Sequence, residues 1–115
     1  MVSSVTPIEM WPVLQLTTGL TTLRVSASAL GEMLKRAVFT NIGVTAVTLT
    51  IYKVPSGGTA ASSNAVRYTY SLAAGSDPLV PQELINMVLP QGASLQATAS
   101  AAGAINTTGS GFSFA

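Results

Sequence analysis

The chain has 115 residues, of which only 8% are charged, and its formal net charge is +1. So few basic residues predict no nucleic-acid partner, because phosphate binding needs a basic stripe. The absence of Cys and His excludes disulfides, thiolate metal sites and histidine catalysis. No stretch approaches the roughly 18 unbroken apolar residues of a membrane span, so no membrane partner is expected.

The first 12 residues are expected to form an extended N-terminal arm, followed by a single domain at residues 13–115. Pro7 and Pro12 lack amide donors and hold the residues before them in extended conformations. The large apolar side chains of the arm are Ile8, Met10 and Trp11. They pack either on the core of their own domain or on a neighbouring subunit, where aromatic anchors are favoured.

Residues 37–55 hold the longest run of β-forming residues, and this run predicts a central hairpin. Asn41, Ile42 and Gly43 interrupt it as a turn would. The second half alternates apolar residues with Thr and Tyr, and this period of two is typical of a half-buried strand. A cluster of charges at residues 32–36 precedes the run and is expected to lie on an edge, where charges discourage unwanted strand pairing.

Alternation of the same kind predicts further strands at residues 13–18, 20–27, 66–72, 95–101 and 105–114. Residues 81–88 predict one short helical turn, because Pro81 suits the first turn of a helix and Glu83 its positive end. Gly109 and Gly111 indicate a bulge or a close approach in the last strand. About eight short strands, separated by frequent turn signals, predict a single all-β domain, a sandwich or a barrel.

The sequence offers no candidate catalytic, cofactor-binding or metal-binding residue. Its four carboxylates are scattered over four segments, and each has a local explanation as part of an arm, an edge, a turn or a helix start. Calcium would need several oxygen ligands close together, and a glycosidase would need a placed pair of carboxylates. We therefore expect that the protein is not an enzyme and has no cofactor.

The surface of such a chain must consist largely of Thr, Ser, Ala, Asn and Gln. It suits a small Ser- and Thr-rich β domain or a protein that other subunits cover. Tyr68 and Tyr70 share a face of their predicted strand with Val66 and Leu72, which favours packing in the core or against another subunit over stacking on a sugar. The candidate interface residues are Ile8, Met10, Trp11, Tyr52, Tyr68 and Tyr70.

Several strand and turn segments together resemble a group of small virion proteins from tailed bacteriophages. The segments are residues 40–43, 47–58, 72–75, 89–92, 95–101 and 104–106. The likeness covers about residues 37–112 and does not extend to the first 30 residues. It departs from the pattern at Ala93, where an acidic residue often follows the glycine.

This resemblance implies a small β-sandwich, jelly-roll-like or Greek key, with a structural role on the particle. The expected role is a capsid decoration (cement) protein that binds the assembled shell, with the major capsid protein or another virion protein as its partner. The alternative is a neck, tail or fibre component, which could also bind a receptor or a sugar. The expected location is the virion, at the capsid surface rather than the tail, after synthesis in the host cytoplasm. Exposed sandwich edges and an apolar arm also predict self-association as a dimer or trimer.

Overall fold

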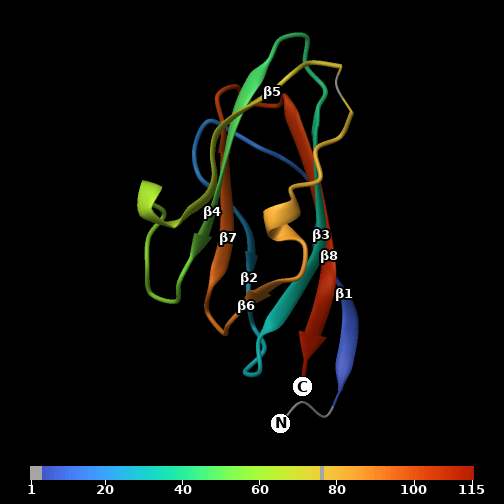
Figure 1. Cartoon of the computed structure of the whole chain (residues 1–115), viewed down its shortest axis with the longest axis vertical. Helices are drawn as coiled ribbons and strands as arrows, with labels where there is room; N and C mark the ends of the chain where they lie inside the picture. Colours follow the sequence, from blue (N-terminus) through green and yellow to red (C-terminus); the bar gives the residue numbers. More distant parts are fainter. Residues whose placement is uncertain (1–3, 76) are drawn as a thin grey trace.

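The computed structural model describes residues 4–75 and 77–115, so residues 1–3 of the expected arm lie outside the described residues. The described chain forms two four-stranded antiparallel sheets packed face to face (Figure 1). In order across the first sheet lie β1 (Val5–Gln15), β8 (Ile105–Phe114), β3 (Glu32–Asn41) and β6 (Met87–Leu89). In order across the second lie β2 (Thr21–Val25), β7 (Ser94–Ala99), β4 (Val47–Val54) and β5 (Ala65–Leu72).

The strands pair from the outside of the sequence inward: β1 with β8, β2 with β7, β3 with β6 and β4 with β5. This is the winding of a jelly roll, in which one long antiparallel ribbon folds over into two sheets. Two 3-10 turns, η1 (Ser62–Asn64) and η2 (Gln82–Leu84), precede β5 and β6. The all-β sandwich of about eight strands is thus confirmed, and η2 is the helical turn expected within residues 81–88. No helix in the described chain is long and apolar enough to cross a membrane.

The predicted central hairpin is wrong, because β3 and β4 belong to different sheets. Residues 42–46 carry the chain from one sheet to the other instead of turning it back. The Asn41 side chain fixes this corner: its Nδ2 donates to the backbone oxygens of Thr45 and Leu72, both at 2.9 Å, and its Oδ1 accepts from the Gly43 amide at 2.8 Å. Asn and Gly favour a corner between sheets as much as a turn within one, because both demand a sharp change of direction.

Strand β1 takes in most of the segment expected to be an arm. It pairs with β8 along residues 5–15, so the expected boundary between residues 12 and 13 falls inside a strand. Its register shifts between Glu9 and Trp11 and again between Trp11 and Leu14. Each shift inserts an extra residue and so breaks the period of two that marks a regular strand. The prolines are tolerated because β1 lies at the edge of its sheet.

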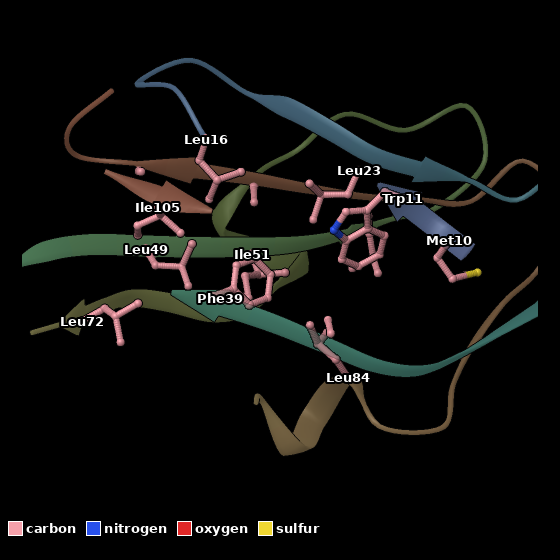
Figure 2. Packing of buried hydrophobic residues seen from close by; sticks show 14 of the residues in the cluster. Met10, Trp11, Leu16, Leu23, Phe39, Leu49, Ile51, Leu72, Leu84 and Ile105 are labelled. Atoms are coloured by element: carbon pink, nitrogen blue, oxygen red, sulfur yellow. The ribbon is translucent and has the colours of Figure 1, made fainter. Parts of the chain in front are cut away.

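The core lies between the two sheets, with Trp11 packed into it from β1 (Figure 2). The Trp11 ring covers Gly109, where an added Cβ would lie 2.6 Å from a ring carbon, and its Nε1 donates to Thr107 Oγ1 at 3.2 Å. At Gly111 an added Cβ would collide with the Met33 carbonyl oxygen. The close approach expected at both glycines is therefore confirmed, and it lets β1 and β3 pack tightly on either side of β8.

Candidate functional site

The three candidate interface residues of the N-terminal segment do not form an exposed anchor. Met10 and Trp11 are buried in the core of their own domain, and Ile8 packs against the same core. The β-bulge between Glu9 and Trp11 turns two consecutive side chains inward. Of the two packing alternatives for this segment, the structure shows the one within the domain.

The candidate tyrosines lie in the second sheet, where Tyr68 and Tyr70 are exposed and Tyr52 is half-buried. The alternation expected between Tyr68 and Tyr70 is interrupted by Thr69, which has a φ of 46°. The Thr69 amide donates to Thr50 Oγ1 at 3.1 Å. The strand face that the sequence pattern predicts for these two residues is therefore broken by an irregularity.

Tyr70 belongs to a cluster that links the edges of the two sheets. The Arg67 guanidinium lies 4.5 Å from the centre of the Tyr70 ring and donates to both carboxylate oxygens of Glu83, at 2.6 and 2.7 Å. Arg67 belongs to β5 and Glu83 to η2, which leads into β6. The hydrogen bond from Arg67 lowers the pKa of Glu83, while the same bond raises the pKa of Arg67. This cluster ties the two sheets together along one side of the sandwich.

The Glu83 ion pair should make stability depend on pH in the acid range. The folded-state pKa of Glu83 lies below its ordinary value of 4.5. The contribution is therefore fully present above pH 4.5 and is lost as pH falls through the folded-state pKa. We expect Glu83→Gln to cost about 0.5–1 kcal/mol at pH 7 and progressively less below pH 4.5, measured by urea unfolding across this range. Arg67→Met should likewise remove the part of the pH dependence of stability that comes from this ion pair. If Glu83→Gln costs the same at pH 3 and at pH 7, the ion pair does not contribute in this way.

A second bidentate pair joins β2 to β3. Arg24 donates through Nε and Nη2 to Glu32 at 2.8 and 2.6 Å, and the hydrogen bond with Glu32 raises the pKa of Arg24. Two of the four carboxylates are thus held by arginines, and Glu9 and Asp77 are exposed elsewhere. Among the described residues, no three His, Cys, Asp or Glu side chains lie together as a metal site. Glu32 and Glu83 thus hold neighbouring elements of the fold together.

The outer face of the first sheet carries a row of apolar side chains. Pro7, Phe112 and Met33 lie opposite one another on β1, β8 and β3, and Val88 continues the row onto β6. Residues that lie opposite each other project to the same side of a sheet. Since the neighbours of Met33 in the sequence are buried in the interior, the row faces outward, and Val88 is 52% exposed. Val5 and Phe114 form a second apolar pair below it.

A charged row crosses the same face above these apolar residues. Glu9 and Arg36 lie on either side of Ser110, and all three are exposed. Lys35, at the register shift beside Arg36, donates to Asn86 Oδ1 at 3.2 Å. Neither Glu9 nor Arg36 makes an ion pair with another described residue. The row therefore carries acidic Glu9 on one side of β8 and basic Lys35 and Arg36 on the other.

Above the charged row the face becomes apolar again around a small hollow of about 160 Å³. Val13 and Val38 line it from β1 and β3, together with Thr40, Asn106, Thr107 and Thr108. We call the outer surface of β1, β8, β3 and β6 the apolar face. The outer surface of the second sheet is different in kind: its residues include Thr22, Thr48, Tyr52, Ser71, Gln96 and Thr98.

Further exposed apolar residues lie in the connection between β3 and β4, at the end of the sandwich opposite the chain termini (Figure 1). Val44 is 95% exposed there, and Ile42 is exposed beside it. The hydrogen bonds of Asn41 hold the base of this connection. The sequence pattern at Asn41, Ile42 and Gly43 predicts a turn, and it does not reveal that the apolar side chains there are exposed.

No model of a protein family matches this sequence, and no curated protein matches it. Among solved structures, the fold is similar to that of VP2 in the subviral particle of infectious bursal disease virus, a viral protein, with a TM-score of 0.49 and 19% identity. The match covers 95% of this chain and 32% of that chain, so the chain spans about a third of the length of that protein. At this identity the similarity is one of fold.

Proposed function

We propose that this protein is a non-enzymatic structural component of a virus particle, a decoration (cement) protein that binds the assembled capsid shell. The observation that carries the proposal is the distribution of side chains on its surface. Apolar residues gather on the outer face of one sheet and at one end of the sandwich, in a chain with only 8% charged residues. The resemblance of residues 37–112 to small virion proteins of tailed bacteriophages supports the same role.

A protein of this kind would act through binding alone. It stabilises the shell because it binds the assembled state and has no site on the separated subunits, so its binding free energy is lost when the shell comes apart. At a free concentration of 100 times Kd, each occupied site contributes about 2.7 kcal/mol. Many equivalent sites on one shell multiply this modest contribution, and neither a cofactor nor a catalytic group is required.

The proposal is tested by the number of copies on the purified parent particle. Quantitative mass spectrometry against the major shell subunit should give one copy per shell subunit or a simple fraction of it. A handful of copies per particle would contradict decoration and favour a neck, tail or fibre component. In that case, glycan binding at the exposed Tyr68 becomes the next measurement. Absence of the protein from the particle would overturn the virion role altogether.

Purified shells that lack the protein provide the matching control. Adding the protein back should raise the temperature at which the shells come apart, and the increase should level off at the stoichiometry measured on the native particle. An equal mass of an unrelated small β-sandwich protein should leave that temperature unchanged.

A further inference from the structure

We propose that the apolar face binds a second copy of this chain, related by a twofold axis that runs parallel to the strands above β8. In this dimer Glu9 of each copy pairs with Arg36 of the other. The inference concerns the isolated protein and does not depend on its proposed place on a virus particle; on a particle, the shell would take the place of the second copy on this face.

The apolar face has the composition and the size of a weak protein interface. Its lower half presents Pro7, Met33, Phe112, Phe114, Val5 and Val88. The whole apolar face has four strands spaced by about 4.8 Å, and its long strands have about ten residues at about 3.3 Å each. Its projected size is therefore roughly 15 by 33 Å. Two such faces bury close to the roughly 1,000 Å² at which specific association begins. We therefore expect a dimer that dissociates at low protein concentration.

The charged row favours a second copy of this chain as the partner, because the acidic and basic groups of one copy can pair with those of the other. Glu9 and Arg36 lie at one height on opposite sides of β8. A twofold axis parallel to the strands exchanges the two sides and keeps the height, so each Glu9 meets an Arg36 of the other copy. An axis across the strands through this row would bring Glu9 to Glu9 and Arg36 to Arg36. The charges thus select the first arrangement, in which one surface supplies both halves of an isologous contact.

The same axis also matches the apolar rows. Because height along the strands is preserved, the row of Phe112 faces its own counterpart, and so does the region of Val13 and Val38. The strands of the two copies then run in nearly the same direction, as in the aligned packing of two sheets. Ser110, next to the axis, is small enough to let the faces approach. The apolar contacts supply most of the affinity, and the charge pairs supply orientation and partner choice.

Sedimentation equilibrium over a wide range of protein concentrations tests the proposal. The wild-type chain should show a monomer–dimer equilibrium. Glu9→Arg and Arg36→Glu should each weaken self-association by roughly tenfold or more, because each variant places like charges in both pairs. An equimolar mixture of the two variants should dimerise again, since every pair across a mixed dimer then has opposite charges. The double variant Glu9→Arg/Arg36→Glu should recover most of the wild-type affinity.

Thermal unfolding of each variant controls for loss of fold, since both positions are exposed and should leave monomer stability unchanged. A wild-type chain that stays monomeric at high concentration would overturn the proposal, as would a trimer. If the two single variants, their mixture and the double variant all dimerise with the affinity of the wild type, the dimer does not form through this face. If the protein is monomeric but still decorates particles, only the dimer inference is wrong. If it dimerises but is absent from particles, only the proposed function is wrong.

Discussion

Replacing Arg24 with Met is expected to lower the free energy of unfolding by about 3–5 kcal/mol, because it leaves a buried carboxylate without its partner. Glu32 is only 1% exposed, and both of its oxygens accept hydrogen bonds from Arg24. Without the guanidinium, the remaining close donor is the Ala27 amide at 3.5 Å. Urea unfolding at neutral pH measures the effect.

The opposite substitution provides the control for this pair. Glu32→Gln should cost less than Arg24→Met, because the Arg24 side chain is 26% exposed and can turn toward water. Adding Glu32→Gln to Arg24→Met should recover part of the lost stability, since no buried charge then remains. If Arg24→Met alone stays within 1 kcal/mol of wild type, Glu32 is not the buried charge that this structure places between β2 and β3.

Trp11→Ala should have an effect of similar size, about 3–5 kcal/mol, because it empties the space between β1 and the second sheet. The ring is 1% exposed, covers Gly109 and donates to Thr107. The matched control is Val13→Ala on the same strand, which is 70% exposed and should change stability by less than about 0.5 kcal/mol. A Trp11→Ala protein of wild-type stability would restore the interpretation of the first 12 residues as a detachable arm.

The sequence predicts the fold class and the regular strands well, because alternation survives wherever pairing is uninterrupted. The last predicted strand, residues 105–114, coincides with β8. The strand around Val47, Leu49 and Ile51 is also found, with these three side chains buried. In each case one strand face is covered by the core, and local composition is enough to reveal it.

Two features could not be predicted from local pattern. The β-bulges of β1 turn consecutive residues to the same side, so the strand does not alternate and resembles an irregular arm. The strand that pairs with β3 cannot be predicted locally either, because the turn residues at Asn41 are compatible with a next strand in the same sheet or in the other sheet. Both depend on contacts with β8, which lies roughly 60 to 110 residues away in the sequence.

The apolar face cannot be recognised from the sequence for a related reason. Phe112, Met33 and Pro7 come from three distant segments, and only the strand register brings them into one row. Met33 lies inside a segment that the sequence marks by its charges. The alternation of Phe112 with Phe114 was the available signal, but it does not reveal whether those rings point into the core or out of it.

The position of β8 between β1 and β3 has a consequence for the synthesis of this protein. Residues 105–114 leave the ribosome after every other strand, yet β1 can enter its sheet only by pairing with them. The innermost pair, β4 with β5, is the first that a growing chain can close, and pairing can then proceed outward toward the chain ends. We therefore expect slow, all-or-none folding once β8 has emerged, on the millisecond-to-second scale of domains dominated by distant contacts. Until that step, the edge of β3 stays open to other nascent chains.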